Sequence, residues 1–113
     1  MDTAKMKTLE QVHDALDLVE DARADGNLLP AERLELEKAS EQLRNLARTN
    51  IKQKEQELVE ALKTDTRELN DMIGQMKKST ERLAQISEVI LKANKIAEDL
   101  ITVVSKALSV GLV

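Results

Sequence analysis

The stretch from Val59 to Leu108, VEALKTDTRELNDMIGQMKKSTERLAQISEVILKANKIAEDLITVVSKAL, decides the fold. Core-type positions recur through it at alternating spacings of three and four, for about seven heptads. One arm of this repeat consists of Leu62, Leu69, Met76, Leu83, Ile90, Ala97 and Val104. The other arm consists of Val59, Thr66, Ile73, Thr80, Ser87, Asn94, Ile101 and Leu108. The spacing predicts one long helix, or two collinear helices, whose seam packs on another helix.

The apolar stripe of this region widens toward its C-terminal half. Positions that flank the seam are charged before about residue 84 and mostly apolar after it. A wider stripe indicates two or more neighbouring helices, supplied either by residues 3–60 or by another subunit. We expect the seam to contact partner helices, with Asn94 fixing the register. The predicted interaction seam consists of Leu69, Ile73, Met76, Leu83, Ile90, Asn94, Ala97, Ile101, Val104 and Leu108.

The whole pattern predicts one all-α domain over residues 1–113. Helices are expected at about 3–24, 30–63 and 65–110, with stop and start signals at Asp25-Gly26-Asn27 and Pro30. Lys52–Glu57 has no apolar residue, so it is either a solvated length of helix or a place where the chain changes direction. The predicted architecture is an elongated helical hairpin or three-helix bundle with a coiled-coil-like long C-terminal helix.

Composition limits the classes of function. The 113 residues include no aromatic residue, no cysteine and one histidine, His13, with a net charge of −4. An aliphatic core favours a thin bundle, and the missing rings argue against binding of single-stranded nucleic acid by base stacking. No basic stripe is present, so we expect no nucleic-acid partner. No nucleophile–base pair or phosphate loop can be assembled, so we expect no enzymatic activity and no required cofactor.

The segment from Asp21 to Glu32, DARADGNLLPAE, resembles the twelve-residue loop of an EF-hand. The resemblance implies Ca²⁺ held by oxygens of Asp21, Asp25, Asn27 and Glu32, with a sharp turn at a glycine. The sequence departs from the motif at its third position, where an arginine replaces an oxygen ligand, and no second loop is present. The end of one helix followed by the beginning of the next accounts for the same residues.

These features predict a non-enzymatic protein–protein interaction module, an adaptor, chaperone or structural subunit, which acts by helix packing and oligomerisation. Self-association or binding of foreign helices is expected, in the cytoplasm, because no signal peptide is visible. Calcium binding at residues 21–32 is the first alternative. The second is a membrane-active or secretion-related protein that uses residues 96–113. Three charges in that apolar run argue against a spanning helix.

Overall fold

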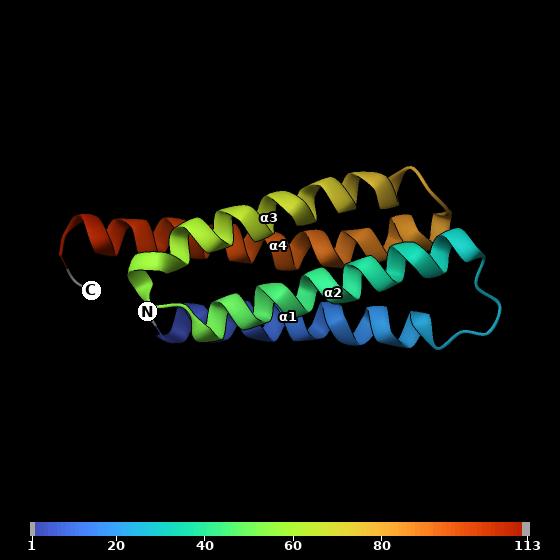
Figure 1. Cartoon of the computed structure of the whole chain (residues 1–113), viewed down its shortest axis with the longest axis horizontal. Coiled ribbons are helices and arrows are strands. Elements are labelled where there is room, and N and C mark those ends of the chain that lie inside the picture. Colours follow the sequence, from blue (N-terminus) through green and yellow to red (C-terminus); the bar gives the residue numbers. More distant parts are fainter. Residues whose placement is uncertain (1, 112–113) are drawn as a thin grey trace.

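The computed structural model describes residues 2–111, which fold into an elongated bundle of four helices (Figure 1). The helices are α1 (Asp2–Arg23), α2 (Pro30–Lys52), α3 (Glu55–Lys77) and α4 (Glu81–Ser109). Each helix runs antiparallel to the next, and α1 and α3 each pack against both α2 and α4. The molecule measures 51 × 21 × 17 Å. The expected all-α class, the elongated shape and the long C-terminal helix are confirmed.

A single aliphatic core runs along the centre of the bundle. Its largest fully buried side chains are Leu36, Leu43, Leu46, Leu58, Leu62, Leu69, Met76, Leu83, Ile90, Leu100, Val12 and Val19. All four helices contribute, because each presents its residues at spacings of three and four to the same axis. Leucine, isoleucine, valine and methionine fill a bundle of this width without rings, as the composition predicted.

The predicted helix over residues 30–63 is interrupted. Helix α2 ends at Lys52, and Gln53 and Lys54 adopt extended backbone angles before α3 begins at Glu55. The turn closes with hydrogen bonds from the N–H of Gln53 to the Thr49 carbonyl and from the N–H of Leu58 to the Lys54 carbonyl. The chain changes direction inside the stretch that has no apolar residue, where a continuous helix would have had no side chain to bury.

The predicted helix over residues 65–110 is also two helices. The helical region begins ten residues earlier than predicted, at Glu55, and is divided at Lys78–Thr80. At this division Thr80 caps α4, because its hydroxyl accepts a hydrogen bond from the Leu83 N–H at 3.2 Å. Asp65, the expected start, lies within α3 and accepts a hydrogen bond from the Thr49 hydroxyl of α2 at 2.7 Å. Burial raises the pKa of Asp65.

Asn94 joins α4 to α3 inside the core. Its side chain is fully buried, and its Nδ2 donates to the Thr66 carbonyl and to Asn70 Oδ1, each at 3.0 Å. Asn50 makes a similar link between α2 and α1 through the Lys5 carbonyl, at 2.7 Å. Such buried amides tie neighbouring helices at one register, since only one alignment satisfies the donors. The register role predicted for Asn94 stays a prediction, and its hydrogen bonds here are made with α3 of the same molecule.

Candidate functional site

The predicted interaction seam lies inside the chain's own bundle. Eight of its ten residues are buried, and Ile101 and Leu108 are half-buried. The buried ones are Leu69, Ile73, Met76, Leu83, Ile90, Asn94, Ala97 and Val104. In this fold the seam contacts other helices of the same molecule.

Two of the carboxylates in the predicted calcium loop, those of Asp25 and Glu32, bond to other groups of the protein. Asp21 lies in α1, while Asp25 Oδ1 accepts a hydrogen bond from the Asn27 N–H at 2.9 Å and Asp25 Oδ2 pairs with Arg82 of α4 at 2.8 Å. These two contacts, the Asn27 amide first, lower the pKa of Asp25. Across residues 2–111 no three acidic or histidine side chains converge as metal ligands would. The three carboxylates proposed as ligands, those of Asp21, Asp25 and Glu32, therefore do not converge on one point.

Glu32 instead connects the two turns at this end of the bundle. It is buried, and its carboxylate accepts from the Leu29 N–H at 3.1 Å and from the Thr80 hydroxyl at 2.9 Å. The first contact satisfies an N–H that the start of α2 would otherwise leave free. Both contacts, that of Leu29 first, lower the pKa of Glu32. The loop thus acts as a clamp between α2 and the cap of α4.

The lowered pKa of Glu32 predicts a loss of stability in acid. A carboxyl whose folded pKa lies below its unfolded value stabilises the fold above about pH 4.3, and this contribution disappears as the pH falls through the folded pKa. We expect the melting temperature to drop between about pH 5 and 3, and to drop less in a Glu32→Gln variant. Thermal unfolding followed by circular dichroism measures both curves. Parallel curves for the two proteins would contradict the assignment.

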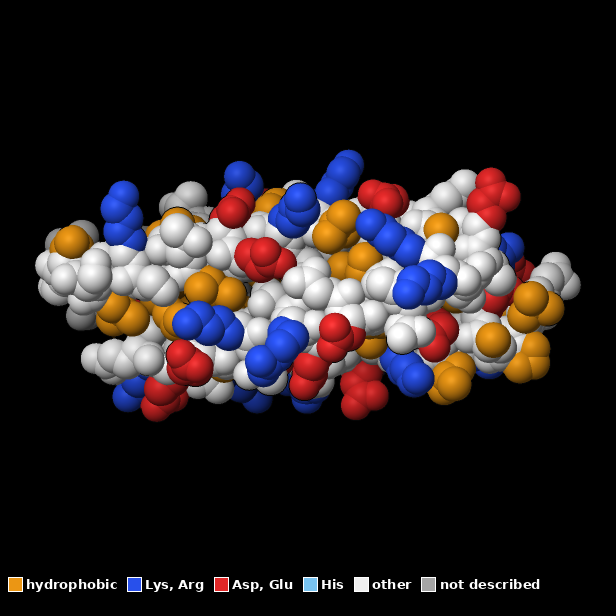
Figure 2. All heavy atoms as spheres, turned by 90° about the horizontal axis from the view of Figure 1, so that it is seen from above, with side chains coloured by type: hydrophobic (Ala, Val, Ile, Leu, Met, Phe, Trp, Pro, Cys, Tyr) orange, Lys and Arg blue, Asp and Glu red, His pale blue; other side chains and the backbone are white. Residues whose placement is uncertain are grey.

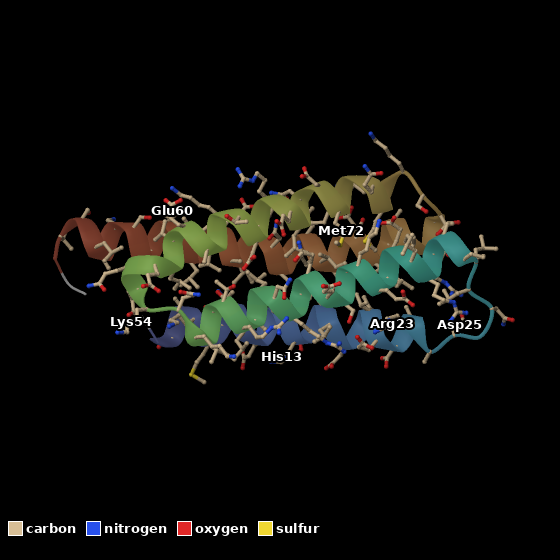
Figure 3. The ribbon with its side chains drawn as sticks, in the orientation of Figure 1. His13, Arg23, Asp25, Lys54, Glu60 and Met72 are labelled. Atoms are coloured by element: carbon tan, nitrogen blue, oxygen red, sulfur yellow. The ribbon has the colours of Figure 1, made fainter. Side chains whose placement is uncertain are left out.

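A groove of about 720 Å³ lies between α1 and α2. His13, Leu16 and Arg23 line it from α1, and Figure 3 shows His13 and Arg23 on the side of α1 that borders α2. The α2 wall consists of Glu37, Ser40, Glu41, Arg44, Ala47, Arg48 and Ile51. The histidine that sequence analysis left without a role therefore faces this groove.

An ionic cluster closes one part of the groove floor. Glu20 accepts hydrogen bonds from the buried Ser40 hydroxyl, from Arg23 at 3.1 Å and from Arg44 at 3.0 Å. The Ser40 hydrogen bond, followed by the two arginines, lowers the pKa of Glu20. Because Glu20 of α1 contacts Ser40 and Arg44 of α2, the cluster joins α1 to α2, and its carboxylate offsets part of the charge of the two arginines.

Apolar side chains continue the groove beyond this cluster. Smaller hollows extend it over Met6, Leu9 and Ile51, toward the N-terminal end of α1. Met6 is 65% exposed and Ile51 is 60% exposed. Figure 2 looks down on the α3 side of the bundle and shows Lys and Arg side chains interspersed with Asp and Glu, with apolar side chains between them. The α1–α2 groove, defined by these residues, is the candidate site.

Comparison of this chain with protein families, with curated proteins and with solved structures found no match. Within residues 2–111, no helix combines the length and the apolar character needed to cross a membrane. The C-terminal run proposed for membrane action extends to residues 112–113, which lie outside the described part of the chain. A function is therefore inferred from the residues that line the groove.

Proposed function

We propose that this protein is a non-enzymatic interaction module that binds an amphipathic helix of a partner protein in the α1–α2 groove. The observation that supports the proposal is the elongated groove itself, in which the apolar residues Met6 and Ile51 are exposed and Leu16 is half-buried. Exposed apolar side chains that gather in a groove are typical of helix-binding surfaces. The core is already filled, so a partner can dock without opening the bundle.

The charges beside the groove specify the partner's chemistry. On α1, the exposed side chains Glu10, Asp14 and Asp17 follow one another at helical spacing along the outer edge. On α2, the opposite wall carries two acidic and two basic side chains, Glu37, Glu41, Arg44 and Arg48. A complementary helix has an apolar stripe with basic residues on the flank toward α1 and uncharged polar residues on the flank toward α2. Such complementarity selects the orientation and speeds the encounter.

A synthetic helix tests this proposal. We would use a fluorescein-labelled peptide of about six turns with leucines at spacings of three and four, lysines on one flank and glutamines on the other. We expect it to bind the full chain in fluorescence anisotropy, and a peptide of the same composition with scattered leucines not to bind. An Ile51→Asp variant should weaken binding about tenfold or more, equivalent to 1.4 kcal/mol.

The matched control is Gln75→Asp, which places the same charge on an exposed position of α3. It should leave the affinity unchanged, because α3 does not border the groove. Equal binding by the Ile51 variant and the parent protein would exclude the groove as the site. Absence of binding by the stripe peptide up to about 1 mM, an affinity of only 4.1 kcal/mol, would overturn the proposal.

A further inference from the structure

The two residues between α2 and α3 connect two helical hairpins. The first hairpin is α1–α2 and the second is α3–α4, and only Gln53 and Lys54 lie between them. Both have extended angles, with φ −81° and ψ 139° at Gln53 and φ −73° and ψ 155° at Lys54. Neither residue is glycine or proline, and glutamine and lysine both favour helix. The turn thus depends on the packing of the hairpins and not on its own sequence.

The caps of this turn are also weak. Lys54 stands at the N-cap of α3 and, within the described residues, makes no capping hydrogen bond with its side chain. The usual capping residues have a side-chain oxygen that accepts from the helix, which lysine lacks. The segment Lys52–Glu57 consists of lysine, glutamine and glutamate, all strong helix formers. A helix that continues from α2 into α3 is therefore an accessible conformation of the same residues.

We propose that two copies of this chain exchange hairpins through a straightened Gln53–Lys54 hinge. In the exchanged dimer, Pro30–Lys77 forms one helix of roughly 70 Å, at 1.5 Å per residue. The α1–α2 hairpin of each copy then packs on the α3–α4 hairpin of the other. The partner is a second copy of the chain, and the surface that it covers is the face between the two hairpins. This inference does not involve the α1–α2 groove.

The contacts that join the two hairpins in the closed monomer are also made in the exchanged dimer, where they join two copies. The hydrogen bond from Thr49 of α2 to Asp65 of α3, and that from Gln42 to Glu68, would each join two copies. The same core residues are buried, so exchange costs mainly the entropy of association, as in other domain-swapped dimers. High protein concentration during refolding therefore favours the dimer, while dilution favours the closed monomer.

Substitutions at Lys54 are expected to shift the equilibrium between the closed monomer and the exchanged dimer. Proline fits the closed form, because φ −73° is near the angle that its ring imposes and Gln53 already has the extended conformation required before a proline. In the continuous helix, proline at this position is strongly disfavoured. Alanine at position 54 has the opposite effect, since it is the best helix former.

The experiment refolds the full chain at about 1 mM and measures mass by light scattering after size-exclusion chromatography. We expect a dimer in the parent protein, about tenfold less in Lys54→Pro and more in Lys54→Ala. Gln75→Asp, on the exposed side of α3 and away from the hinge, should leave the dimer fraction unchanged. Monomer alone in both the parent and Lys54→Ala, or an equal dimer fraction in Lys54→Pro, would overturn the proposal.

A second measurement distinguishes exchange from surface association. A Thr49→Cys chain and an Asp65→Cys chain are refolded together and oxidised. We expect a disulfide between the two chains in the exchanged dimer, because positions 49 and 65 then meet across copies. A dimer in which this mixed disulfide does not form would be a surface dimer and would contradict hairpin exchange.

Discussion

Replacing Ile90 by aspartate is expected to unfold the protein. Ile90 is completely buried on α4 in the aliphatic core, and the substitution both removes its packing and introduces a carboxylate without a partner. A buried uncompensated charge alone costs about 3–5 kcal/mol, and the lost isoleucine adds to this. Domains of this kind have a total stability of about 5–15 kcal/mol, so little or no folded protein should remain. Far-ultraviolet circular dichroism at 25 °C measures the loss.

The matched control is Ile51→Asp, which makes the same chemical change at an exposed position. Because Ile51 is 60% exposed, we expect its effect on the free energy of unfolding to stay within about 1 kcal/mol. The comparison of the two variants also tests whether the predicted interaction seam is buried inside the monomer. If Ile90 faced a partner and not its own core, Ile90→Asp would give a helical monomer with normal thermal unfolding, and that result would contradict the structure.

Replacing Asn94 by aspartate is expected to destabilise the fold, whereas replacing it by leucine is expected to stabilise it. Its Nδ2 faces the Thr66 carbonyl, Asn70 Oδ1 and, at 3.5 Å, a carboxylate oxygen of Glu98. Aspartate would place an acceptor against these acceptors, so we expect a loss of about 3–5 kcal/mol. Among residues 2–111, Asn94 Oδ1 has no hydrogen-bond partner. Leucine removes that unpaired atom and should stabilise the fold by about 1 kcal/mol.

Urea unfolding of the two variants measures these changes through the midpoint and the slope. The leucine variant is also expected to lose some uniqueness of packing, which broadened amide signals in nuclear magnetic resonance would reveal, since the amide selects one helix register. Equal destabilisation by leucine and aspartate would show that Asn94 contributes more through its hydrogen bonds than its unpaired oxygen costs. A stable aspartate variant would contradict the buried position.

The heptad pattern predicted which side chains point inward, but not where the chain turns. Met76 and Leu83 are seven residues apart on the two sides of the α3–α4 turn, and both are fully buried. Two antiparallel helices that share a core present the same periodicity as one continuous helix. Glycine and proline usually mark a reversal, but neither occurs at Gln53–Lys54 or at Lys78–Thr80. Only the packing of the whole bundle selects these turns.

The groove was beyond sequence analysis for a related reason. Ile51 continues the apolar series of α2, a pattern that by itself predicts burial, yet it is mostly exposed beside Met6. Which apolar residues remain uncovered depends on the pairing of α1 with α2, and no local pattern encodes that pairing. The Asp21–Glu32 loop illustrates the same limit, since its cation partner, Arg82, lies more than fifty residues away.

The aliphatic core has an optical consequence. Without phenylalanine, tyrosine or tryptophan, the protein absorbs almost nothing in the near ultraviolet and has no intrinsic fluorescence. A tryptophan placed in a ligand peptide, or at position 51 beside the groove, would be the sole emitter in the mixture. Its spectrum would then report solvent exposure at one chosen place, with no background from the bundle. The same property makes absorbance at the usual wavelength unsuitable for measuring the concentration of this protein.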